Sequence, residues 1–119
     1  MQPFREILVW QRAYKLALAI YKVSADFPKE ERYGLTSQLR RAAMSVAANI
    51  VEGAKRKTQA DFAKFLNIAE SSAAETDLWL LFAKDLGFAS EEVLTPLQTE
   101  LKEVERMLYA FRNKVESNL

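Results

Sequence analysis

Polar side chains that could carry out chemistry recur at intervals of three and four residues from Gln38 to Arg56, and a second group follows at Ser72 and Glu75. This spacing places each group on one face of a helix, so we expect the two groups to meet between neighbouring helices. A carboxylate there could act as a general base if burial removed its water, and the candidates are Glu75 and Glu52. The chain has no histidine and no cysteine, which removes the commonest general base, the thiol nucleophile and the usual zinc ligands. We therefore predict no catalytic residue, no metal site and no cofactor, and keep an enzyme that uses Glu75 only as a remote alternative.

A structural role is the favoured interpretation of these polar side chains. Arg41 and Glu75 carry opposite charges and can pair between two helices, with amide and hydroxyl groups beside them. Networks of this kind more often fix the register of a fold than carry out a reaction. The residues that we predict to form a buried polar network are Gln38, Arg41, Asn49, Ser72 and Glu75.

Four helices are needed to position these residues. Half of the 119 residues are hydrophobic, and only 3 glycines and 3 prolines interrupt the chain, which favours long helices over a sheet. Apolar residues recur with the helical period over residues 7–25, 35–54, 59–86 and 91–115, each range being approximate. The predicted fold class is all-α, an antiparallel up-and-down four-helix bundle in a single domain that spans residues 1–119.

Local residues indicate where these helices begin and end. Proline at position 28 ends the first helix, and Thr58 with an acid three residues later begins the third. Gly87 suits a left-handed helix end. The fourth helix has two candidate starts, and we favour Ser90 as its N-cap over Thr95, which with Gln98 forms a capping box. Pro96 lies inside that helix, so we expect a kink or a break near it.

The large aromatic side chains of the first and third helices fall at core spacing. We predict that they pack inside the bundle and do not form a ligand cage. These residues are Trp10, Tyr14, Tyr21 and Trp79.

The second and third helices carry more apolar residues than one core face can use. Residues 78–83 are six apolar residues in a row, so some of them must point away from the core of their own bundle. An exposed apolar patch of this kind usually marks an interface, and we therefore expect a homo-oligomer. The alternative is a monomer in which the other two helices and the N-terminal arm cover the second and third helices. The candidate interface residues are Met44, Val51, Leu78, Leu81 and Phe82.

Charge is unevenly distributed, although the net charge is only +1. Residues 32–64 contain seven basic and two acidic side chains, whereas residues 65–119 contain five basic and ten acidic ones. If an oligomer repeated the basic end of the second helix around a ring, it would form a positive rim able to contact phosphates of RNA or DNA. A solvated helix end is the simpler alternative, and it is favoured for one protomer. The candidate nucleic-acid-binding residues are Arg40, Arg41, Lys55, Arg56 and Lys57.

Hydropathy gives no indication of a membrane partner. The sequence contains no apolar run that approaches the length of a spanning helix, roughly 18 residues, and no apolar N-terminal leader. We expect a cytoplasmic protein.

The second helix also carries a motif that resembles a known family. The motif reads Gln38-Leu39-Arg40-Arg41-Ala42-Ala43, then Ser45-Val46, Asn49-Ile50 and Glu52-Gly53. Matching residues precede it at Phe4, Leu8-Val9-Trp10-Gln11, Phe27-Pro28 and Tyr33-Gly34-Leu35, and follow it at Phe62, Phe65-Leu66, Ile68-Ala69, Ser72, Glu75 and Leu86-Gly87. With these residues the chain resembles the bacterial four-helix-bundle family named for proteins encoded in intervening sequences of large-subunit ribosomal RNA genes. That family is itself similar to the accessory variability determinants of diversity-generating retroelements.

The resemblance implies a ring-like homopentamer of four-helix bundles without an established enzymatic activity. The retroelement members are basic and resemble partners of a reverse transcriptase and of nucleic acid, but this chain lacks their strong positive charge. Ala47 stands where relatives commonly carry proline, and Ser71 where they often carry glycine. The second helix is therefore expected to be straighter than in those relatives.

These observations support one leading hypothesis for function. It is a non-enzymatic homo-oligomeric bundle that serves as an interaction or scaffolding protein, with nucleic acid as a candidate partner. The alternative is an assembly module that binds protein only.

Overall fold

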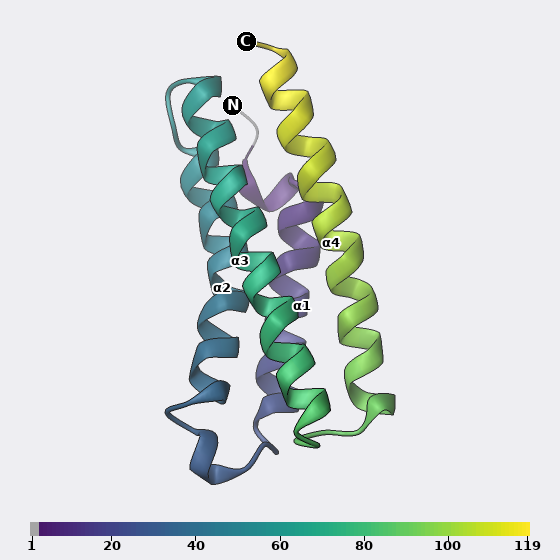
Figure 1. The fold of residues 1–119 in the computed structure, drawn as a ribbon. Helices are drawn as coiled ribbons and strands as arrows, with labels where there is room; N and C mark the ends of the chain where they lie inside the picture. The colour runs from purple at the N-terminus through teal and green to yellow at the C-terminus, as the bar shows by residue number, and fades with distance from the viewer. Residues whose placement is uncertain (1–2) are drawn as a thin grey trace.

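Four long helices run alternately in opposite directions and pack into a bundle in the computed structural model, which describes residues 3–119 (Figure 1). The helices are α1 (Leu8–Ser24), α2 (Leu35–Ala54), α3 (Gln59–Asp85) and α4 (Glu91–Ser117), with short 3-10 helices η1 (Phe4–Glu6) and η2 (Lys29–Glu31). No strand occurs between residues 3 and 119. The predicted all-α four-helix bundle is confirmed.

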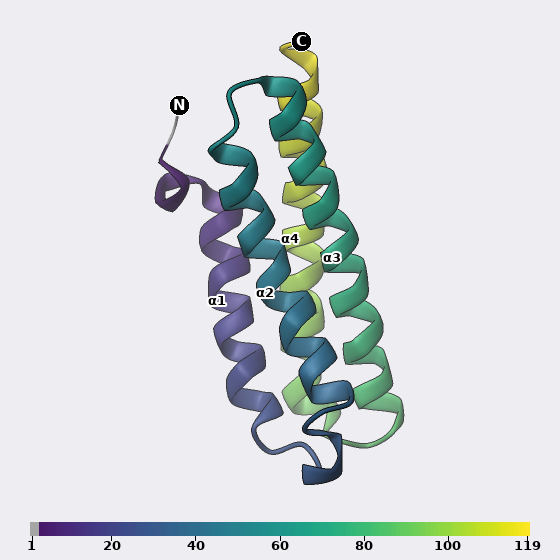
Figure 2. The same ribbon diagram turned by 90° about the vertical axis from the view of Figure 1, so that its left-hand side faces the viewer.

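The two ends of the bundle carry different connections. The turn between α2 and α3 lies at the same end as η1 and the C-terminal end of α4, as both views show (Figures 1 and 2). The α1–α2 and α3–α4 connections lie at the opposite end, about the length of the bundle away, and the principal extents are 45 × 24 × 20 Å.

The predicted helix ends are formed by the expected side chains. Thr58 Oγ1 accepts a hydrogen bond from the Asp61 N–H at 3.1 Å, and Ser90 Oγ accepts one from the Val93 N–H at 3.3 Å. Gly87 has a φ of 74°, a conformation that costs glycine nothing. The Phe88 N–H donates to the Ala83 carbonyl and the Gly87 N–H to the Lys84 carbonyl, which completes a Schellman motif at the end of α3.

The expected break near Pro96 is wrong, because α4 continues through this residue from Glu91 to Ser117. Pro96 lies in the second turn and is exposed, so its ring meets no neighbouring helix. Its missing N–H leaves only the Glu92 carbonyl without a helical partner, and that exposed first turn is open to water.

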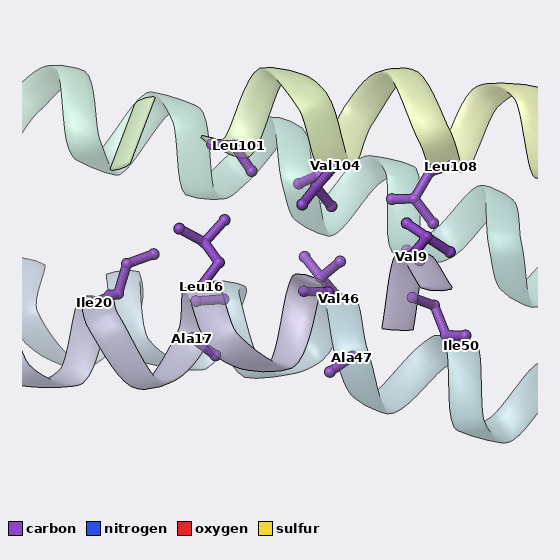
Figure 3. Packing of buried hydrophobic residues seen from close by; sticks show 14 of the residues in the cluster. Val9, Leu16, Ala17, Ile20, Val46, Ala47, Ile50, Leu101, Val104 and Leu108 are labelled. Carbon is purple, nitrogen blue, oxygen red and sulfur yellow. The ribbon is translucent and has the colours of Figure 1, made fainter. Parts of the chain in front are cut away.

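The core consists of aliphatic side chains from all four helices. Figure 3 shows Leu16 and Ile20 of α1 and Val46 of α2 directed toward Leu101 and Val104 of α4. The largest fully buried side chains are Ile20, Leu39, Ile50, Leu66, Leu80, Leu94, Leu101 and Leu108. No helix within residues 3–119 has the length and hydropathy that a membrane-spanning segment requires.

The predicted core position of two aromatic residues is wrong. Tyr14 is 47% exposed and Tyr21 is 40% exposed, whereas Trp10 and Trp79 are partly buried against the core. The core side of α1 is instead the neighbouring stripe, which includes Val9 and Leu16. Two adjacent stripes of this helix share the same three- and four-residue spacing, and only packing against α2 and α4 decides which one is buried.

Candidate functional site

One candidate surface is an apolar groove between α1 and α2, which we call the groove surface. Its walls come from Tyr14, Leu18 and Tyr21 of α1 and from Met44 of α2, with Ala17 and Ala47 at the floor. The hollow measures about 310 Å³, and its lining is almost wholly apolar. Leu18 is 54% exposed, so one wall of the groove is a large aliphatic side chain in contact with solvent.

A second apolar surface lies on α3, and we call it the ridge surface. It consists of Leu78, Leu81 and Phe82, which are 45–47% exposed, although they belong to a run of six apolar residues. Trp79 packs against the core and lies 5.8 Å from the ring of Phe82, between ring centroids. The ridge surface therefore rests on a fixed, partly buried base.

The structure divides the predicted interface residues between these two surfaces. Met44 belongs to the groove surface, and Leu78, Leu81 and Phe82 form the ridge surface, while Val51 is half-buried. A polar groove lies between α2 and α3 and separates the two surfaces. Sequence reasoning missed Tyr14, Leu18 and Tyr21 as surface residues. One signal was available for Leu18, since Lys15 and Lys22 lie one turn before and one turn after it on the same helix face.

The polar groove brings together most of the predicted polar network. Its lining includes Gln38, Arg41, Ser45, Ser72 and Glu75. The Ser45 and Ser72 hydroxyl oxygens lie 2.8 Å apart, which links α2 to α3. Asn49 Nδ2 donates to the Ser45 carbonyl at 2.8 Å and to its hydroxyl at 2.9 Å.

The predicted burial of this network is wrong for three of its five residues in the single chain. Gln38, Arg41 and Glu75 are exposed, whereas Ser72 is buried and Asn49 is half-buried. Arg41 and Glu75 line the same groove but form no ion pair in the described part of the chain. The helical spacing placed these residues on the facing sides of α2 and α3, but the longer side chains lie at the mouth of the groove. A catalytic role for Glu75 required a buried carboxylate, and this one is open to water.

The predicted nucleic-acid-binding residues are separated into two groups. Arg40 and Arg41 lie in the first half of α2, about 21 Å of helix from Lys55. Arg40 fastens α1 to α2, because its guanidinium donates to Ser24 Oγ at 2.8 Å and to the Tyr21 carbonyl at 3.0 Å.

The other group lies at the α2–α3 turn, and we call it the basic end. Arg56 is partly neutralised there, since its guanidinium donates to Glu52 at 2.7 Å and lies 4.7 Å from the ring centroid of Phe65. Lys55 and Lys57 are exposed, and neither forms an ion pair within residues 3–119. Lys64, which follows on α3, is also exposed and unpaired in that range, and sequence reasoning had not included it among the candidates.

Ion pairs connect α4 to the other helices. Arg12 of α1 donates to both carboxylate oxygens of Glu100, at 2.6 and 2.8 Å, and these bonds lower the pKa of Glu100. Arg112 donates to Glu70 of α3, so its charge is matched. Glu105 differs, because burial and the charge of Asp77 raise its pKa.

Metal-binding residues are not clustered in the described structure. Across residues 3–119, no group of three or more aspartate or glutamate side chains is arranged to hold an ion.

Comparisons with known proteins agree with the fold. The family model described as 23S rRNA-intervening sequence protein matches residues 5–110. A crystal structure of a protein of unknown function from the S23 ribosomal protein family of Bacteroides thetaiotaomicron VPI-5482 superposes with a TM-score of 0.79 and 25% sequence identity. The alignment covers 87% of this chain and 97% of that one. No curated protein matches the chain. Since the family model covers nearly the whole bundle, the chain belongs to the 23S rRNA-intervening sequence protein family.

Proposed function

We propose that this protein is a non-enzymatic, homo-oligomeric helical bundle that acts as an interaction or scaffolding module. The observation that carries the proposal is the pair of exposed apolar surfaces on a bundle whose core is already complete. Soluble monomers rarely expose clustered large apolar side chains, because water contact with such area is unfavourable. Burial between copies of the chain removes that area from water. The resemblance to the family implies five copies, and this number is part of the proposal.

The mass of the protein in solution tests the assembly. A single chain has a mass of 13.6 kDa, so sedimentation equilibrium distinguishes one copy from five. We expect the wild type to form a discrete oligomer and Leu81→Glu to dissociate it, because a charge on the ridge surface cannot be buried there without a partner. A wild-type protein that sediments as a single chain over the whole accessible concentration range would refute the proposed function.

Nucleic acid is a second candidate partner, and the unpaired lysines of the basic end favour it. Lys55, Lys57 and Lys64 are exposed, and the nearest arginine, Arg56, keeps one pair with Glu52. In an oligomer this group would be repeated, and several lysines can then contact successive phosphates. Such contacts follow the backbone of RNA or DNA and carry no information about sequence.

Fluorescence anisotropy with structured RNA and with duplex DNA tests this partner. We expect binding that weakens steeply with salt, since each phosphate contact releases a counterion. Triple replacement of Lys55, Arg56 and Lys57 by glutamate should abolish it. A matched control replaces Lys29, Arg32 and Lys102 by glutamate, which changes the total charge equally but leaves the basic end intact. Absence of binding even at low salt would leave the alternative, an assembly module that binds protein only.

A further inference from the structure

The two apolar surfaces differ in shape, which limits how copies of the chain can meet. The groove surface is a hollow between two helices, lined by Tyr14, Leu18, Tyr21 and Met44. The ridge surface projects from α3 alone, through Leu78, Leu81 and Phe82. A hollow and a projection are complementary to each other, but neither is complementary to itself.

The charges beside the two surfaces are opposite in sign. Lys15 and Lys22 lie one turn on either side of Leu18, and α1 contains no acidic residue at all. Glu75 precedes Leu78 by three residues, and Asp85 follows Phe82 by three. These four side chains are exposed and form no ion pair in the part of the chain that the structure describes.

Further charges extend the same contrast. Arg40 and Arg41 add positive charge beside Met44 on α2. On the other side, Asp77 lies one turn before Leu81 and interacts unfavourably with Glu105 of α4. Lys102 offsets only part of the effect of burial and of Asp77, so the pKa of Glu105 stays raised. A basic surface that approaches this side of the molecule would be attracted to it.

Because the two surfaces differ in charge and in shape, a two-fold arrangement of the copies is unfavourable. A two-fold dimer through the groove surface would bring Lys15 and Lys22 against their own copies, and a dimer through the ridge surface would do the same for Glu75 and Asp85. Like charges brought together in an interface are costly, whereas complementary charges speed and orient association. A contact between the groove surface of one copy and the ridge surface of another avoids the repulsion that each surface would have with its own copy.

We propose that the ridge surface of one copy docks in the groove surface of the next, so that the copies join head to tail. In this arrangement Leu78 and Phe82 enter the hollow between Leu18 and Met44, while Glu75 and Asp85 face the lysines of α1. Such a heterologous contact leaves one free groove and one free ridge on every pair, so growth continues until a ring closes. The proposal rests on the homo-oligomer proposed above and specifies which surfaces form it.

Two variants that each lose one surface test this arrangement by mixing. Leu18→Glu keeps its ridge surface, and Phe82→Glu keeps its groove surface. We expect each variant alone to sediment as a single chain. An equimolar mixture should form a one-to-one pair that grows no further, because the two remaining surfaces are both disabled. The mixture is studied at the highest soluble concentration, since one junction lacks the avidity of a closed ring.

Other outcomes distinguish the arrangement from the oligomer itself. If the wild type assembles but the mixture remains single chains, or if either variant alone still forms assemblies, the head-to-tail pairing is overturned while the oligomer stands. If the wild type is a single chain, the proposed function fails first. Met44→Glu and Leu78→Glu serve as replacements if circular dichroism shows that a first variant is unfolded. Tyr109→Glu, on exposed α4 surface outside both sites, should leave the wild-type mass unchanged.

Discussion

Gly53 shows how a single residue sets the distance between two helices. A Cβ atom at this position would lie 2.8 Å from the Phe62 ring and 2.9 Å from the Phe65 Cβ. Alanine favours a helix by about 1 kcal/mol relative to glycine, but overpacking typically costs about 1–3 kcal/mol. We expect Gly53→Ala to lower the free energy of unfolding by up to about 2 kcal/mol, the net of these two effects, as measured by urea denaturation.

A control for this variant comes from the same helix. Ala48→Gly lies on exposed surface of α2 and changes helix propensity without altering packing, so it should cost about 1 kcal/mol. If Gly53→Ala instead stabilises the protein, Phe62 and Phe65 can move aside and α2 does not depend on close contact at this point.

The ion pair between Arg12 and Glu100 gives a pH-dependent contribution to stability. Hydrogen bonds from Arg12 hold the pKa of Glu100 below 4.5, its ordinary value. A depressed carboxyl pKa in the folded state contributes stability that is present above pH 4.5 and is lost as pH falls through the folded pKa. We therefore expect Glu100→Gln to lower the Tm slightly at pH 7, because the pair is partly exposed, and the difference from wild type to vanish below the folded pKa.

Thermal unfolding followed by circular dichroism between pH 3 and 7 measures this effect. Glu92→Gln is a suitable control, since Glu92 is exposed and has no ion-pair partner in the described chain. A difference between Glu100→Gln and wild type that stays constant with pH would show that packing, and not the charge, is responsible.

Residue-level predictions from the sequence succeeded where the cause is local. Thr58, Gly87 and Ser90 act within a few bonds of their own backbone, so their roles can be deduced from neighbouring residues. The pairing of Arg12 with Glu100 joins positions 88 residues apart in sequence. No local pattern identifies such a partner, because it depends on how α1 and α4 pack.

The core of the bundle is the clearest property at the level of the helices. Leu101 is 1% exposed and lies in α4, facing α1, and its truncation would leave a cavity. We expect Leu101→Ala to reduce the free energy of unfolding by about 2–5 kcal/mol, as in other buried leucine sites. Tyr109→Ala, on the exposed side of the same helix, removes a contact in which the Arg112 guanidinium lies 5.5 Å from the ring centroid. It should change the free energy of unfolding by less than about 1 kcal/mol in urea denaturation. Equal effects of the two variants would contradict this assignment of the α4 faces.

Helix positions could be predicted more reliably than helix orientation. The bounds of α2, Leu35–Ala54, agree with the prediction, because apolar spacing defines them locally, with Gly34 just before the helix and Gly53 in its last turn. The rotation of α1 could not be deduced, since the stripe through Tyr14 and Tyr21 has the same period as the stripe through Val9 and Leu16. The exposed stripe through Tyr14 and Tyr21 is part of the groove surface. The rotation of α1 therefore explains both the wrong core assignment and the missed site.

At the scale of the whole molecule, sequence reasoning identified the excess of apolar residues but not its distribution. The run Leu78–Ala83 already required an exposed apolar patch, and the ridge surface is found there. The remaining exposed apolar area lies between α1 and α2, and the polar groove between α2 and α3 separates it from the ridge surface. This separation depends on how three helices are arranged, so it could not be deduced from the sequence. Arg41 and Glu75, expected to be buried, are exposed and line the polar groove.

The head-to-tail arrangement makes a prediction about charge that apolar variants cannot test. Exchange of Lys15 and Lys22 for glutamate should lower the association constant of the copies about tenfold or more, because acidic groups would then face Glu75 and Asp85. Exchange of Glu75 and Asp85 for lysine should weaken it similarly. A chain that carries all four changes restores opposite charges at every junction, so its assembly should recover toward that of the wild type, as measured by sedimentation in low salt. A two-fold arrangement predicts no such recovery, since like charges would still face each other in the fourfold variant. Added salt should reduce the differences among all of these proteins, because it screens exposed charges over about 10 Å or less.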